Sequence, residues 1–120
     1  MYAARPVLLY DGDPALLASL QFSLELEGFR VADGSARGSD PREAACMVID
    51  QRFGSNGGLS FLADLRTAGC EGRAILLATN PTRRVRQAAS DAGALLIEKP
   101  LLGEALTRAL RSIVNDNEAA

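Results

Sequence analysis

The 120-residue sequence contains no histidine. Histidine is the side chain that proteins use most often as a general base near neutral pH, and it is a frequent zinc ligand. Any catalysis by this chain must therefore use carboxylates, hydroxyl groups or lysine.

Cysteines and long apolar runs are also scarce. The two cysteines, Cys46 and Cys70, show no repeated spacing that would indicate a disulfide scaffold, so we expect a reducing, cytoplasmic setting. No apolar run approaches the ~18 residues of a membrane span. The short run after Arg5 is too brief for a signal peptide. We therefore expect no contact with a membrane.

There is no large surplus of charge of either sign, since the formal net charge is −2. A domain that reads DNA grooves is normally basic, so we expect no direct contact with nucleic acid. Hydrophobic residues make up 48% of the chain, enough for the core of one domain. We interpret the arginines at 83, 84 and 86 as a solvated helix face, with partner binding as the alternative.

Short apolar runs alternate along the chain with segments of helical periodicity. The runs are 7–10, 29–32, 47–49, 74–78 and 95–97. This alternation predicts an α/β fold with a parallel sheet of five strands and helices on both faces. Between the second and third runs, residues 41–45 provide at most a turn of helix.

Helix boundaries can be placed at several positions. Asp13 followed by Pro14 is typical of a helix start, and Gly28 of a helix end. The last helix should place Leu102, Leu106, Leu110 and Ile113 inward. We expect one domain over residues 1–114 and a polar tail over residues 115–120.

Four polar residues lie at or just after the ends of predicted strands: Asp11, Asp50, Thr79 and Lys99. The carboxyl ends of parallel strands meet at one edge of an open α/β sheet, where ligands bind. Carboxylates suit Mg²⁺, and a lysine and a hydroxyl can bind the oxygens of a phosphoryl group. A carboxylate can also act as the nucleophile that forms an aspartyl-phosphate.

Several short motifs, in this order and spacing, cover nearly the whole chain. They are Val-Leu-Leu-Tyr-Asp at 7–11, Asp50, Gly58-Leu59, Leu-Ala-Thr ending on Thr79, Ala92-Gly93-Ala94 and Glu98-Lys99-Pro100. Together they resemble the response regulator receiver domains of two-component systems, which are CheY-like members of the flavodoxin-like superfamily. Residues 19–29 and 97–103 look like those of a bacterial subgroup. The resemblance implies the strand order 2-1-3-4-5.

The same resemblance implies a role for each polar residue. Asp50 would be the phosphoacceptor, Thr79 the switch hydroxyl, and Lys99 the lysine that pairs with the phosphoryl group. Asp11 would bind Mg²⁺ together with Asp50 and the backbone carbonyl of Arg52. The chain would catalyse at most its own phosphotransfer and dephosphorylation.

The partners are implied in the same way. The phosphoryl donor would be a phosphohistidine on a sensor histidine kinase or a histidine phosphotransfer protein. A downstream protein would bind the face that helix four, strand five and helix five form in receivers, and a homodimer is compatible with the pattern. The chain could be complete or a fragment of a longer regulator.

The chain also departs from the receiver pattern. Gly12 stands where the family has a second acid, which predicts weak Mg²⁺ binding. Asp13 could compensate, but we interpret it as a helix cap. Fewer residues than usual separate Gly28 from Asp50, so the second helix should be shortened or absent. Leu96 stands where a switch Tyr or Phe is typical.

Two alternatives follow. The chain could be a pseudo-receiver, a protein-binding module that works without phosphorylation. It could also be a small nucleotide- or flavin-binding α/β domain. The absence of a glycine-rich first loop and an aromatic content of only 5% argue against the latter.

Overall fold

The apolar runs form the strands of one five-stranded parallel sheet with the order β2-β1-β3-β4-β5. The computed structural model describes residues 5–101 and 104–119. The strands are β1 (Val7–Tyr10), β2 (Val31–Asp33), β3 (Cys46–Asp50), β4 (Ala74–Thr79) and β5 (Ala94–Lys99). The predicted fold class and strand order are confirmed.

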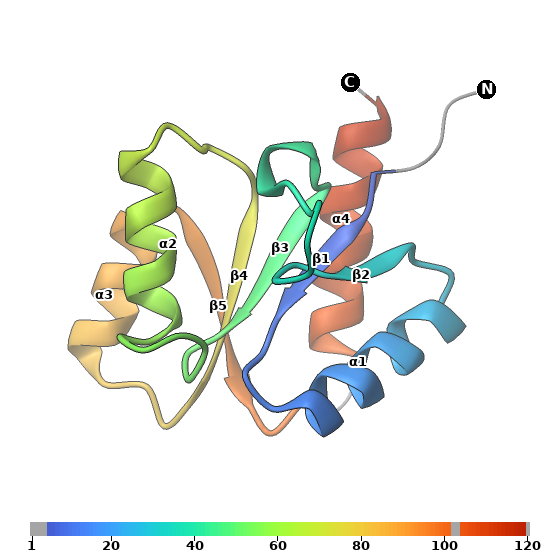
Figure 1. Ribbon diagram of the computed structural model, residues 1–120. Coiled ribbons are helices and arrows are strands. Elements are labelled where there is room, and N and C mark those ends of the chain that lie inside the picture. The colour runs from blue at the N-terminus through green and yellow to red at the C-terminus, as the bar shows by residue number, and fades with distance from the viewer. Residues whose placement is uncertain (1–4, 102–103, 120) are drawn as a thin grey trace.

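Helices cover both faces of the sheet, as Figure 1 shows. They are α1 (Pro14–Leu26), α2 (Gly58–Thr67), α3 (Arg83–Asp91) and α4 (Ala105–Ala119). The two helices α1 and α4 lie on one face, and α2 and α3 lie on the other. Within the described part of the chain, no helix is both long enough and apolar enough to cross a membrane.

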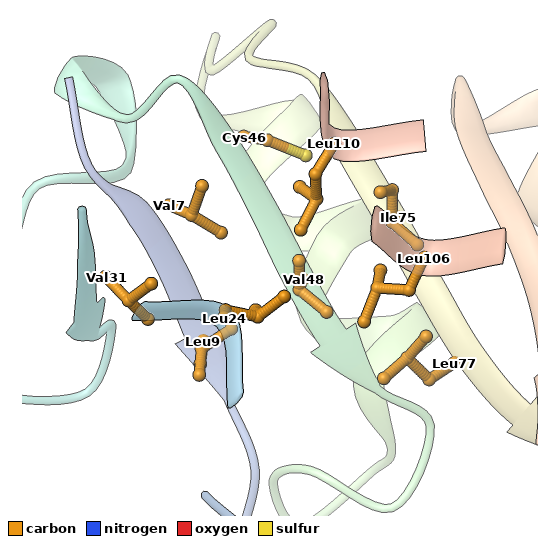
Figure 2. Close-up of a cluster of buried hydrophobic side chains, with 10 residues drawn as sticks. All are labelled: Val7, Leu9, Leu24, Val31, Cys46, Val48, Ile75, Leu77, Leu106 and Leu110. Atoms are coloured by element: carbon orange, nitrogen blue, oxygen red, sulfur yellow. The ribbon is translucent and has the colours of Figure 1, made fainter. Parts of the chain in front are cut away.

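Two apolar clusters, one on each face of the sheet, form the core. The cluster under α1 and α4 contains Leu24, Leu106 and Leu110 from these helices together with residues from four of the strands (Figure 2). The cluster under α2 and α3 contains Leu62 and Ala89 with the alternate strand residues. Because side chains of a strand point to both faces in turn, a sheet covered on both faces needs nearly continuous apolar strands.

The second helix of the predicted pattern is replaced by a short connection. Between β2 and β3 the chain forms only a 3-10 turn at Pro41–Glu43, and Asp40 caps this turn by accepting the N–H of Arg42. The predicted shortening is therefore confirmed.

The second strand begins later than predicted, at Val31 rather than at Phe29. The N–H groups of Gly28 and Phe29 donate to the carbonyls of Glu25 and Leu24, which closes the end of α1 as a Schellman motif. Gly28 has the positive φ of 97° that this motif requires. Phe29 is therefore part of the helix end and does not extend β2.

The last helix has the predicted inward face, since Leu106 and Leu110 are buried and Ile113 packs against the same cluster. Leu102, also predicted to point inward, lies outside the described residues. The helix continues to Ala119, so most of the polar stretch 115–120 has a helical backbone.

Arg66 on α2 joins three segments on one side of the molecule. Its guanidinium group donates to the carbonyl oxygens of Ala92 (2.8 Å), Cys70 (3.0 Å) and Gly72 (2.7 Å). These carbonyls belong to the end of α3 and to the loop that leads into β4. Arg66 therefore fixes both segments relative to α2.

Replacing Arg66 by methionine should lower the free energy of unfolding by about 2 kcal/mol, because hydrogen bonds to a charged donor are lost together. Urea unfolding measures this loss. The control is Arg84→Met on the exposed face of α3, which should change stability by less than about 0.5 kcal/mol. Equal stability of the two variants would contradict the role of Arg66.

Candidate functional site

The ends of four strands bring the predicted polar residues to one edge of the sheet. Asp50, Thr79 and Lys99 are the last residues of β3, β4 and β5, and Asp11 directly follows β1. Tyr10 of β1 pairs with Ile49 of β3, so Asp11 and Asp50 each come one residue after this pair. Thr79 pairs with Lys99 across β4 and β5.

Asp50 and Lys99 are in direct contact although their residue numbers differ by 49. The Oδ2 atom of Asp50 lies 2.6 Å from Nζ of Lys99. Asp50 is only 3% exposed and is the one buried charged residue among those described. Lys99 is the only lysine in the sequence. An ion pair at this depth persists only when each charge has a partner, because burial disfavours isolated charges.

The other carboxylate oxygen of Asp50 faces Arg52. The backbone N–H of Arg52 donates to Oδ1 at 2.8 Å, and Nε of the same residue lies 3.5 Å from this oxygen. The Arg52 side chain is 69% exposed, so its guanidinium group lies at the rim of the site. Both oxygens of Asp50 therefore have positively charged neighbours.

The pKa of Asp50 reflects a balance of opposing effects. Burial raises the pKa, but the hydrogen bond from Lys99, the N–H of Arg52 and the positive charges of both residues lower it, and the net result is a lowered pKa. Asp50 is therefore ionised at neutral pH, which is the form that a carboxylate nucleophile needs.

The loop after Asp50 is held close to the site. The side chain of Gln51 accepts the N–H of Leu59 at 2.9 Å, and the backbone carbonyl of Gln51 accepts the N–H of Gly58 at 2.8 Å. A Cβ atom on Gly58 would collide with the backbone oxygen of Asp50. Glycine at this position lets the start of α2 lie against the end of β3.

The carboxylates of Asp11 and Asp13 accept hydrogen bonds from backbone N–H groups at the start of α1. Asp13 accepts the N–H groups of Ala15 (2.9 Å) and Leu16 (3.3 Å), which confirms that it is the helix cap. Asp11 accepts the N–H of Asp13 at 2.9 Å. A Cβ atom on Gly12 would meet nothing within 4 Å, so a side chain can start at this position without a clash.

These donors do not fit a tightly bound Mg²⁺ ion. Mg²⁺ requires near-octahedral coordination by oxygen atoms that are free to bind it, usually from one or two carboxylates together with waters. Here both Asp50 oxygens already have cationic neighbours, and one Asp11 oxygen accepts a backbone N–H. Within residues 5–101 and 104–119, no three acidic, cysteine or histidine side chains gather as a metal-binding group. Weak Mg²⁺ binding through Asp11, Asp50 and the Arg52 carbonyl stays a prediction.

The predicted switch positions lie on β4 and β5. Thr79 is exposed at the edge of the sheet, next to Lys99 on the neighbouring strand. Leu96 is partly buried and packs against the cluster under α2 and α3. It therefore contributes apolar contact where receivers have an aromatic ring.

Sequence reasoning did not identify an aromatic cluster beside the site. Tyr10, Phe53 and Phe61 pack together with ring centroids 4.9–5.4 Å apart. Phe53 also donates its N–H to the backbone oxygen of Asp50 at 2.9 Å. Burial raises the pKa of Tyr10 to about 12. The positions of Tyr10 next to Asp11 and of Phe53 near Asp50 were the available signals.

Replacing Lys99 by methionine should raise the pKa of Asp50, because burial is then opposed only by Arg52. The carboxyl carbon resonance of Asp50, followed by NMR across pH, measures the change.

At neutral pH the Lys99→Met variant should lose about 2 to 4 kcal/mol of the free energy of unfolding. In the parent, folding lowers the pKa of Asp50. The ionised carboxylate therefore stabilises the folded protein at pH values above the pKa of Asp50 in the unfolded chain. This stabilisation is lost as the pH falls through the pKa of Asp50 in the folded protein.

The matched control for this test is Arg86→Met. It removes the exposed Arg86–Glu98 ion pair (2.7 Å), which lies near β5 but away from Asp50. The pKa of Asp50 should not change in this variant. An unchanged pKa in Lys99→Met would show that the ion pair does not control the ionisation of Asp50.

Comparisons with known proteins place the fold. No protein-family model and no curated protein matches the sequence. Solved structures of receiver domains do match, among them one from Clostridium thermocellum (TM-score 0.80, 18% identity, covering 96% of this chain and 98% of that one). Another is a CheY-like receiver domain protein from Methanospirillum hungatei JF-1 (TM-score 0.80, 20% identity, covering 98% of each chain).

A third match is a Burkholderia pseudomallei response regulator with a phosphorylated aspartic acid, a calcium ion and citrate (TM-score 0.72, 21% identity). The match covers 96% of this chain and 71% of that one. The chain therefore has, over nearly its whole length, the fold of response regulator receiver domains that its sequence motifs resemble.

Proposed function

We propose that this chain is a receiver domain whose Asp50 accepts a phosphoryl group from a phosphohistidine. The donor is a sensor histidine kinase or a histidine phosphotransfer protein. The observation that carries the proposal is the buried, ionised carboxylate of Asp50 held 2.6 Å from the only lysine, at the carboxyl edge of a receiver-type sheet. The phosphorylated aspartic acid of the structurally similar Burkholderia protein supports it.

The transfer uses groups that the site already holds. A carboxylate oxygen of Asp50 attacks phosphorus, and the bond from phosphorus to the imidazole nitrogen of the donor breaks. The electron pair of this bond stays on the imidazole nitrogen. When the other ring nitrogen carries a proton before the transfer, the histidine leaves as a neutral imidazole. The ammonium group of Lys99 then contacts a phosphoryl oxygen in place of the carboxylate oxygen. Hydrolysis of the acyl phosphate by water returns Asp50 and inorganic phosphate.

Thr79 is the hydroxyl that would bind the attached phosphoryl group. It is exposed at the same edge of the sheet and pairs with Lys99 on the neighbouring strand. A phosphoryl group bound by Lys99 would therefore lie near Thr79 at the end of β4. Movement of Thr79 towards the phosphoryl group would transmit the signal to β5 and its neighbours.

The output surface in this proposal is the face formed by α3, β5 and α4, which corresponds to helix four, strand five and helix five of receivers with five helices. β5 is an edge strand, and Leu95 on it is 50% exposed. A downstream protein, or a second copy of this chain, would bind there. Leu96 replaces the aromatic switch, so the response would rest on backbone and apolar packing changes.

A second candidate function is a pseudo-receiver that binds a partner without phosphorylation. Gly12 favours it, because the missing acid leaves the donor set unsuited to tight Mg²⁺ binding. In that case substitution of Asp50 would leave partner binding unchanged, whereas a phosphoacceptor requires Asp50.

Phosphorylation can be measured with a small donor that contains a phosphorus–nitrogen bond, such as phosphoramidate. In buffer with Mg²⁺, intact mass spectrometry should show one added phosphoryl group on the parent protein and none on Asp50→Asn. The control Asp13→Asn keeps a good helix cap and should be labelled like the parent. Absence of the adduct on the parent, or its persistence in Asp50→Asn, would refute Asp50 as the acceptor.

A further inference from the structure

The charges around Asp50 are balanced by side chains of the chain itself. Asp50 and Asp11, which follows β1 next to the end of β3, contribute two negative charges. Lys99 and Arg52 contribute two positive charges, so these four formal charges cancel. A site without net negative charge has little electrostatic attraction for a divalent cation. The positive charge that phosphoryl transfer needs must then come from these side chains.

Arg52 has the geometry to provide this charge. Its backbone N–H and its Nε atom both approach Oδ1 of Asp50, while Lys99 binds Oδ2 on the other side. The two cationic groups therefore flank the carboxylate, and the Arg52 side chain is 69% exposed, so it can reach a phosphoryl group that enters from solvent. Guanidinium groups bind phosphoryl oxygens with several parallel donors, which makes them well suited to this ligand.

On the basis of the proposed function, we propose that the guanidinium group of Arg52 takes the place of a divalent cation, so that Asp50 is phosphorylated without a metal ion. During transfer, negative charge is spread over the non-bridging oxygens of the phosphoryl group. Lys99 neutralises this charge from the inner side of the site and Arg52 from the rim. No metal ion is needed for the bond between phosphorus and Asp50 to form.

The contact of Arg52 with an aspartate two residues earlier is not in itself special, and the chain contains a matched example. Arg42 contacts Asp40 through the same two donors, N (2.9 Å) and Nε (3.2 Å). This pair lies before β3, at the opposite end of the strand from Asp50, and the side chain of Asp40 is 34% exposed. The difference is that Arg52 serves a buried acid at the strand end that Lys99 also contacts.

The test is the rate of labelling by phosphoramidate, followed by intact mass with Mg²⁺ and with a metal chelator. The parent should be labelled at rates within about twofold in both buffers. Arg52→Met should be slower in chelator by on the order of tenfold or more, and Arg52→Lys should recover part of the rate. Arg42→Met should behave like the parent. Because Arg52 is exposed, its variants should keep the thermal unfolding midpoint of the parent.

A double variant restores the missing acid. Gly12→Asp with Arg52→Met should be labelled faster with Mg²⁺ than in chelator, by on the order of tenfold or more. The reason is that an acid at position 12, where a Cβ atom meets nothing within 4 Å, adds a metal ligand. Calorimetric titration should also show tighter Mg²⁺ binding by this variant than by the parent. Equal affinity would contradict the view that the charge balance excludes the metal.

The outcomes separate the two proposals. If the parent is labelled only with Mg²⁺, or if Arg52→Met keeps the parental rate in chelator, the role of Arg52 is wrong while Asp50 remains the acceptor. If the parent is not labelled in either buffer, the proposed phosphoacceptor function itself fails.

Discussion

The ion pair between Asp50 and Lys99 depends on the whole sheet. The two residues end β3 and β5, which are separated by β4, and they meet because all three strands run parallel and end at the same edge. Apolar clusters on both faces hold these strands in register. Burial makes the carboxylate costly to leave unpaired, so the fold and the lysine together determine that Asp50 is charged.

Much of the fold could be predicted from periodicity. Strand residues alternate between two covered faces, and this requirement leaves a clear pattern of short apolar runs. The strand order came from the family resemblance. The second strand was placed too early because Phe29 reads as a strand residue, while its N–H closes the end of α1. Such a backbone hydrogen bond leaves only a weak signal, here the glycine before Phe29.

The site was predictable where it depends on strand ends and not where it depends on side-chain direction. Asp50 and Lys99 follow from the rule that parallel strands present their carboxyl ends at one edge. The side chain of Arg52 could turn toward solvent or toward Asp50, and the sequence does not distinguish these directions. The same holds for Arg66, whose acceptors are backbone carbonyls from separate segments.

Lys99 should sense the phosphoryl group directly, because it contacts the carboxylate that accepts this group. Because Lys99 is the only lysine, selective isotope labelling yields one side-chain NMR signal, which can be followed while phosphoramidate is added in metal-free buffer. That signal should shift in the parent as the phosphoryl adduct forms, and it should stay unchanged in Asp50→Asn. An adduct that forms on the parent without any shift of the Lys99 signal would contradict the central role of the pair.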